Sequence, residues 1–328
     1  MAVVQYSFAD NSRSTKRRRS VLFLFATRFV RIASMAILGM TTLSVSATDM
    51  DPRSYSNIPK NLNFVIAGYA NQKGNIAFSP ALHIDNAKLE THTAVFAYAR
   101  SLDFWGKSGK VDVILPAAWL SGTAEVDGKP AERSVNGLTD SIARVYVNLY
   151  GAPSLSMKDF ASYKQDTIVG ISLAVGTPTG QYNPEKLVNL GTNRWYIKPE
   201  IGISKAWGDL TAEFAAGMFN FTDNNQPFQG GTLKQKPIYN MQGHLIYNFG
   251  KGTWLAVDAN YYTGGRTTMD GREANNMQQN WRVGGTFSFP ISKQMSIKLN
   301  GSTGVYSRTG SSFDIISVAW QYRWGEGL

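Results

Sequence analysis

Cysteine is absent from the 328 residues of the chain, and histidine occurs only three times. The absence of cysteine excludes a disulfide scaffold, thiolate catalysis and cysteine-based metal sites. His83, His92 and His244 form no pair at metal-ligand spacing, so we expect neither a metal site nor a cofactor. Long apolar runs are also absent: nothing after Ala47 approaches the ~18 apolar residues that a membrane-spanning helix needs.

Charged residues are scarce as well, at 17% of the chain, whereas aromatic residues make up 12% and there are 31 glycines. This composition is typical of an outer-membrane β-barrel, because half of each strand faces lipid and half faces a polar lumen. Average hydropathy then hides the membrane contact altogether.

Residues 1–47 have the features of an export signal. The basic run Lys16–Arg19 precedes two apolar stretches, Val21–Ala26 and Ile32–Leu43, and Val45–Ala47 offers small residues for cleavage. The alternative is a helical membrane anchor, but its apolar pieces are short and interrupted by arginine. This segment holds seven of the 33 basic residues and one of the 23 acidic ones, so the net charge of +10 is mostly targeting signal. No nucleic-acid partner is therefore expected.

An alternating pattern of apolar and polar residues recurs about a dozen times along the rest of the chain, with almost no helical pattern between the repeats. The last repeat shows it best: Ile316, Val318, Trp320, Tyr322 and Trp324 alternate with Ser317, Ala319, Gln321 and Arg323. Aromatic side chains gather at the strand ends, where amphipathic rings favour the lipid headgroups.

Twelve segments can form strands long enough to cross a membrane at a tilt. They are 60–71, 89–102, 110–122, 140–150, 167–178, 194–205, 210–221, 238–249, 253–263, 280–290, 295–306 and 313–324. We therefore predict an all-β, antiparallel, up-and-down transmembrane barrel of about twelve strands, formed as one domain by residues 48–328. Such a chain is exported through the periplasm to the outer membrane of a Gram-negative bacterium, with outer-membrane lipid and the barrel-insertion machinery as partners.

The lengths of the connections support this topology. Short connections at 103–109, 206–209, 250–252 and 291–294 are expected on the periplasmic side. Long connections at 72–88, 123–139, 179–193, 222–237 and 264–279 are expected outside the cell. The exception is 151–166, a long connection on the periplasmic side. Leu155, Phe160 and Tyr163 could give it one apolar helical face, or it could be an irregular loop.

The same alternation predicts which side chains point into the barrel, because a charge on the lipid face near the midplane costs ~2–4 kcal/mol. The inward polar set is Asp112, Arg144, Lys198, Glu200, Glu213, His244, Asp258, Arg282, Lys298 and Arg323, beside the inward aromatic residues Tyr146, Phe219 and Tyr262. Its mixed sign indicates an ion-pair network that braces a narrow lumen, and the same residues could line a polar solute path.

The segment 89–102 can be read in two ways. If Arg100 points inward, then Phe96, Tyr98, His92 and Glu90 do so too, which would give the lumen an aromatic lining. If Arg100 points outward, it must extend its charged end to the membrane boundary.

Catalysis is not expected. Twelve-stranded outer-membrane phospholipases use a histidine with a serine two positions later, and neither His92 nor His244 has one. No nucleophile-elbow sequence occurs. The pair His83 and Asp85 is the one candidate for a rim protease site, and a solvated loop pair explains it better.

Five stretches resemble the family of outer-membrane proteins named for the meta-pathway of phenol degradation. They are DPRSYSNIP at Asp51–Pro59, NLYGAP at Asn148–Pro153, GTNRW at Gly191–Trp195, YYTGGRTT at Tyr261–Thr268 and QQNWR at Gln278–Arg282. The resemblance covers nearly all of the chain after the signal and implies transport across the outer membrane. It brings no established binding residues.

Two function classes follow. The first is a channel for passive uptake of small solutes, including aromatic or other hydrophobic compounds. The second is a non-transporting surface barrel whose outer loops bind a partner. A continuous lumen would favour the first class, and a lumen plugged by ion pairs would favour the second.

Overall fold

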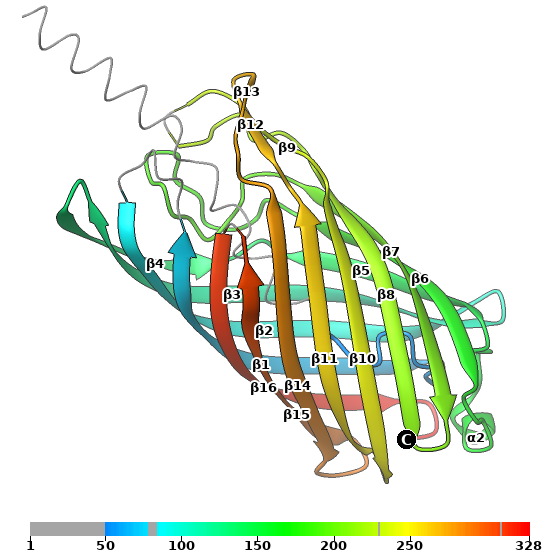
Figure 1. Cartoon of the computed structure of the whole chain (residues 1–328). Coiled ribbons are helices and arrows are strands. Elements are labelled where there is room, and N and C mark those ends of the chain that lie inside the picture. Colours follow the sequence, from blue (N-terminus) through cyan, green and yellow to red (C-terminus); the bar gives the residue numbers. More distant parts are fainter. Residues whose placement is uncertain (1–49, 78–83, 229, 309) are drawn as a thin grey trace, which may run out of the picture.

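The computed structural model describes residues 50–77, 84–228, 230–308 and 310–328, which are almost entirely β-structure (Figure 1). The predicted export signal, residues 1–47, lies outside the described residues, as does His83. None of the helices in the described ranges has the length and apolar character needed to cross a membrane.

Twelve antiparallel strands close into a barrel in which consecutive strands are neighbours. They are β1 (Leu62–Ala77), β2 (Ile84–Phe104), β3 (Lys107–Val126), β5 (Ile142–Tyr150), β6 (Thr167–Gly176), β7 (Tyr196–Trp207), β8 (Leu210–Phe221), β10 (Ile238–Gly250), β11 (Thr253–Gly264), β14 (Gln278–Pro290), β15 (Met295–Ser307) and β16 (Gly310–Gly325). The first and last strands pair from Leu62 with Gly325 to Ala77 with Gly310, which completes the ring. The prediction of a twelve-stranded up-and-down barrel is confirmed.

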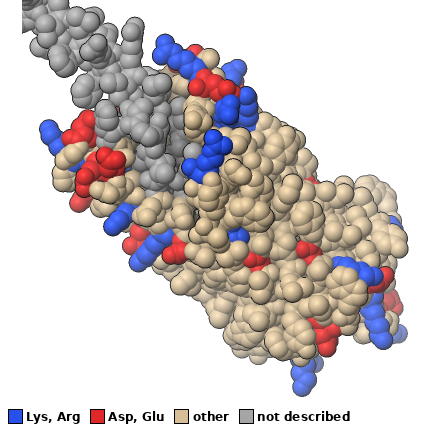
Figure 2. Space-filling view, in the orientation of Figure 1, with Lys and Arg blue, Asp and Glu red and all other residues tan. Residues whose placement is uncertain are grey.

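The outer surface is apolar because the alternating residues turn one face of each strand outward. In β10 the side chains of Tyr239, Met241 and Leu245 are exposed, whereas Asn240 and Gln242 are buried inside. Figure 2 shows most Lys, Arg, Asp and Glu residues gathered toward the two ends of the barrel, with a broad uncharged surface between them. Exposed aromatic residues border this surface, as expected at the headgroups. They include Trp105, Tyr150, Trp207 and Phe249 near one end and Trp119, Trp195, Tyr239 and Trp281 near the other.

One end of the barrel carries tight turns, such as those at Trp105–Gly106, Gly208–Asp209 and Lys251–Gly252. We call it the short-turn end, and by the loop-length rule it faces the periplasm. The connection 151–166 lies there and contains a single helical turn, α2 (Met157–Phe160). The Phe160 and Tyr163 rings stack at 5.6 Å, and the Tyr163 hydroxyl donates to the Gly151 carbonyl, so the connection is folded onto itself. Both proposed descriptions of it are therefore partly right.

We call the opposite end the long-loop end. The structure there differs from the predicted connections. β1 continues to Ala77, β2 begins at Ile84, and β3 continues to Val126, where it turns back as β4 (Lys129–Leu138). The described residues of 72–88 and most of 123–139 are therefore strand. The prediction was wrong because apolar alternation stops where the lipid stops, whereas backbone pairing continues beyond it. Asp127 and Gly128 both have positive φ, the turn geometry that an Asp-Gly hairpin favours, and this dipeptide was the available signal.

Two further predicted loops contain a small sheet at the long-loop end (Figure 1). It comprises β9 (Leu233–Gln235), β12 (Thr267–Met269) and β13 (Arg272–Glu273). Leu233 and Met269 are buried against each other beneath this sheet. The described parts of the connections 222–237 and 264–279 therefore contain paired strands beyond the barrel wall.

Candidate functional site

The short-turn half of the barrel interior is occupied by the N-terminal segment, defined here as Asp51–Asn57. The Asp51 carboxylate forms an ion pair with Lys298 at 2.9 Å, and the backbone N–H of Arg53 donates to Glu213 at 2.7 Å. The Arg53 guanidinium lies 5.6 Å from the Trp254 ring. These contacts join residues far apart in sequence, so the segment is fixed to several strands at once.

Tyr55 is the most deeply held side chain of this segment, with 2% of its surface exposed. Its hydroxyl donates to Glu200 at 3.0 Å, and its ring meets the Tyr146 ring edge-on at 6.1 Å. Glycines make room for the ring: a Cβ added at Gly170 or Gly202 would lie 2.7 Å or 2.1 Å from it. The strands β6 and β7 are thus shaped around Tyr55, which the sequence pattern did not indicate.

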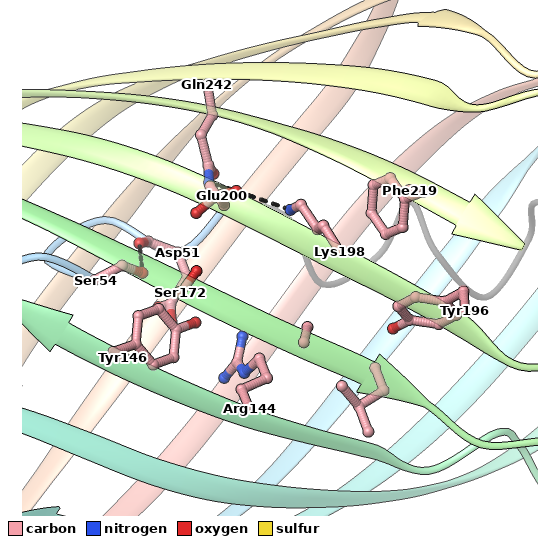
Figure 3. A pocket seen from close by; sticks show the side chains of 12 residues that line it. Asp51, Ser54, Arg144, Tyr146, Ser172, Tyr196, Lys198, Glu200, Phe219 and Gln242 are labelled. Atoms are coloured by element: carbon pink, nitrogen blue, oxygen red, sulfur yellow. Dashed lines mark hydrogen bonds and ion pairs between the residues drawn. The ribbon is translucent and has the colours of Figure 1, made fainter.

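The structure places the acidic members of the predicted inward set beside donors. Asp112 pairs with Arg144 at 2.8 Å. Glu200 pairs with Lys198 at 2.9 Å, as Figure 3 shows. Glu213 accepts from Ser204 as well as from the Arg53 backbone. These groups are buried, so leaving any one unpaired would carry a desolvation cost of several kcal/mol.

Asp258 is the most enclosed of these carboxylates, at 1% exposure. It bonds to His244 Nδ1 at 2.7 Å and accepts from the Thr286 hydroxyl at 2.7 Å. Arg282 is also buried; it donates through Nη2 to Ser302, and its Nε has no acceptor.

Two members of the predicted set lie elsewhere than in the middle of the lumen. Lys298 forms an ion pair with Asp51 and so helps to fix the N-terminal segment in the short-turn half. Arg323 donates from Nε and Nη2 to the Lys293 carbonyl, at 3.0 and 2.8 Å, in the turn at the short-turn end. Its role there is to hold the rim, which alternation alone could not reveal.

A band of apolar and aromatic side chains lies inside the barrel between the charged groups and the long-loop end. We call it the apolar collar. Its buried members are Ala97, Ile114, Ile142, Ala174, Tyr196, Phe219, Ile238 and Tyr262. Phe219 stacks parallel to Phe221 at 6.2 Å, and Tyr196 meets the Phe219 ring edge-on and the Phe221 ring at a tilt. The predicted aromatic residues Phe219 and Tyr262 therefore belong to the collar, whereas Tyr146 contacts Tyr55.

Of the two predicted orientations of the second strand, the structure shows the one in which Arg100 points outward. Phe96 and Tyr98 are 50% and 38% exposed on the outer surface, and Arg100 is exposed there too. Ala97 and Ala99 face inward instead. Arg100 thus lies on the outer face near the short-turn boundary, and the aromatic lining comes from β7, β8 and β11.

Arg194 lies at the long-loop side of the collar, and the prediction did not include it. Only 2% of it is exposed, and its guanidinium lies 4.3 Å from the centroid of the Phe221 ring. Nη2 donates to Gln235, whereas Nε and Nη1 have no partner. Burial lowers the pKa of Arg194 to about 10, so the group stays charged at neutral pH.

A cavity of about 30 Å³ remains between the collar and the N-terminal segment, enough for roughly one water molecule. Tyr196, Phe219, Lys198 and Arg144 line it, together with Asp51 and Ser54 of the segment (Figure 3). Within the described part of the chain, no group of three or more His, Asp or Glu residues could hold a metal ion. The arrangement places aromatic faces beside fixed charges, but a space of this volume holds water and is far below the ~300 Å³ of a typical ligand pocket.

Comparisons with known proteins agree with this architecture. The family described as the MetA-pathway of phenol degradation matches residues 70–319. The structure resembles the COG4313 outer membrane channel from Pseudomonas putida F1, with a TM-score of 0.71 and 16% identity, over 84% of this chain and 100% of that one. It also resembles the transport unit of the autotransporter AIDA-I from Escherichia coli, with a TM-score of 0.50 and 12% identity, over 86% and 95% of the two chains. No curated protein matches the chain in sequence.

The structural similarities establish the fold, an outer-membrane barrel of Gram-negative type, and the first of these neighbours is a channel rather than an enzyme. The match to the family model spans well over half of the sequence, from within β1 to within β16. The chain therefore belongs to the outer-membrane family described by the MetA-pathway of phenol degradation.

Proposed function

We propose that this protein is an outer-membrane channel for passive uptake of small aromatic solutes. The observation that carries the proposal is the apolar collar, in which the Tyr196, Phe219 and Tyr262 side chains come together inside a barrel that also encloses many polar and charged groups. Aromatic rings give a solute favourable stacking and edge contacts without removing water from a charge. The family name supports an aromatic solute, and the structural likeness to an outer membrane channel from Pseudomonas putida supports a channel role.

The path proposed for the solute begins at the long-loop end and passes the collar. It then meets the N-terminal segment, which fills the short-turn half with ion pairs and the Tyr55 ring. Release into the periplasm therefore requires this segment to move. In the closed state the lumen is too narrow for a wide hydrated path, so ion conductance should be low.

Flux into liposomes tests the proposal. Vesicles containing the purified protein should admit phenol faster than protein-free vesicles, and should show little added permeability to a sugar of similar size. Phe219→Ala should reduce the protein-dependent phenol flux, because it removes a ring of the collar. Leu299→Ala on the outer face, where Leu299 is 42% exposed, is the matched control. Equal phenol flux with and without protein, while the barrel remains folded, would favour a non-transporting surface barrel.

A further inference from the structure

The loop that precedes β7 contains four consecutive residues, Gly191–Arg194, whose contacts can be described one by one. Neighbouring residues account for the backbone geometry or the polar groups of the first three. Gly191 is required by a close approach, since a Cβ there would lie 2.7 Å from the Gly180 backbone. Thr192 donates to the Asp140 carboxylate from its N–H at 2.8 Å and its hydroxyl at 2.6 Å. Asn193 adopts a left-handed φ of 55°, which asparagine tolerates, and bonds to Asn224.

Arg194 is the fourth residue, and its guanidinium group is only partly hydrogen-bonded. Two of its three guanidinium nitrogens have no acceptor. The neighbouring carboxylate, Asp140, is already occupied by Thr192 and by the Gly180 N–H at 2.9 Å. No described residue forms an ion pair with Arg194. Buried polar groups are nearly always bonded, and a buried charge without a counterion is costly, so an unpaired guanidinium indicates a missing anionic partner.

The surroundings of Arg194 restrict what that partner can be. The guanidinium lies over the Phe221 ring, which continues into the collar through Phe219 and Tyr196. An anion bound here would have its charge on Arg194 and its remaining part beside aromatic rings. A planar carboxylate matches the geometry of a guanidinium, and an aromatic ring matches the collar.

We propose that Arg194 binds the carboxylate of an aromatic acid whose ring packs against Phe221 and the collar. The inference rests on the proposed function, because it names the class of solute that this path would recognise. It also explains why the loop is braced so firmly. Asp140 and Asn224 hold Thr192 and Asn193 before the arginine, and the Thr222 hydroxyl accepts from the Trp195 N–H after it.

Binding in detergent micelles tests the site without requiring transport. The probes are benzoate, its neutral analogue benzyl alcohol, and acetate, each titrated by calorimetry into the wild-type protein and three variants. Wild type should bind benzoate more tightly than either of the other two probes. Arg194→Gln should weaken benzoate binding roughly ten- to a hundredfold, the usual range for a hydrogen bond to a charged group, and leave benzyl alcohol binding unchanged.

The other two variants provide controls. Arg194→Lys keeps the charge but loses the planar fork, so its benzoate affinity should lie between wild type and Arg194→Gln. Arg272→Gln removes an exposed arginine of β13 and should behave as wild type. Retention of the heat-modifiable electrophoretic shift of a folded barrel shows that each variant is intact.

Two outcomes would overturn the site: an unchanged preference for benzoate in Arg194→Gln, or equal affinity of wild type for benzoate and acetate. Phenol flux without benzoate binding would reject the site and leave the channel standing. Benzoate binding that depends on Arg194 without any aromatic flux would keep the site and reject the channel.

Discussion

The two halves of the lumen differ in how completely a buried charge is bonded. In the short-turn half, Asp258 is bonded to both His244 and Thr286, and Asp51 closes an ion pair with Lys298. In the long-loop half, Arg194 is as deeply buried but has two nitrogens without acceptors, over an aromatic ring. Paired charges brace a structure, whereas an unpaired one is tolerated only where something else benefits from it. The difference separates the part that seals the barrel from the part that is suited to receive a solute.

Removal of a charge from each half should show the largest contrast. Asp258→Ala leaves His244 and Thr286 without their shared acceptor and should lower the free energy of unfolding by about 3–5 kcal/mol. Arg194→Gln removes a charge that has no counterion and should leave the free energy of unfolding unchanged or raise it. Urea unfolding in lipid vesicles, followed by tryptophan fluorescence, measures both. A similar loss in the two variants would mean that the halves do not differ in this respect.

The N-terminal segment, which closes the short-turn half, can be tested by adding one carbon atom beside Tyr55. Gly202→Ala would place a Cβ 2.1 Å from the Tyr55 ring, so the ring must leave its position or strain the strand, at a cost of about 1–3 kcal/mol. Because Tyr55 anchors the N-terminal segment, single-channel conductance in planar bilayers should rise. Gly301→Ala is the matched control, since its Cβ would meet nothing within 4 Å. Unaltered conductance in Gly202→Ala would show that the segment does not limit the path.

A substitution in the apolar collar should have a smaller effect than one that displaces the N-terminal segment. Phe219→Leu keeps an apolar side chain but removes the stacked and edge-on contacts with Phe221 and Tyr196. We expect a loss of about 0.5–1.5 kcal/mol in stability, the usual value of such ring pairs. Binding of an aromatic solute should weaken by a similar amount, whereas binding of cyclohexanol should change less. Calorimetric titration of phenol and cyclohexanol compares the two, and an equal change for both would assign the collar a packing role alone.

The smallest effect is expected at the small sheet of β9, β12 and β13 at the long-loop end. Hydrogen bonds from Lys236 and then Arg266 hold the pKa of the Glu273 carboxyl below its usual 4.5. The folded pKa is lower than the unfolded one, so this stabilisation is complete above pH 4.5 and is lost as the pH falls through the folded value. Amide exchange in β12 and β13, referenced to an unstructured peptide, should accelerate over that acidic range. Glu273→Gln should remove this dependence, and its persistence would point to another titrating group.

Several features of the barrel could be read from the sequence because they depend on local alternation. The twelve strands, their antiparallel order and the outward faces of Tyr239, Met241 and Leu245 follow from a period of two residues beside lipid. Strand ends could not be read in the same way. From Gln72 and Lys73 onward, the side chains no longer alternate between apolar and polar. The backbone of β1 nevertheless remains paired with β2 and β16.

The sequence by itself therefore determined the fold class, the number of membrane strands and the side of each strand that meets lipid. The tertiary structure decided which inward residues meet each other. Tyr55 is 145 residues from Glu200, and only closure of the barrel brings them together. The same holds for Arg194, because the lack of an acceptor for two of its nitrogens depends on the residues packed around it and leaves no pattern in the chain. Alternation is fixed by the covalent backbone beside a uniform lipid phase, whereas pairing inside a closed lumen depends on contacts between strands distant in sequence.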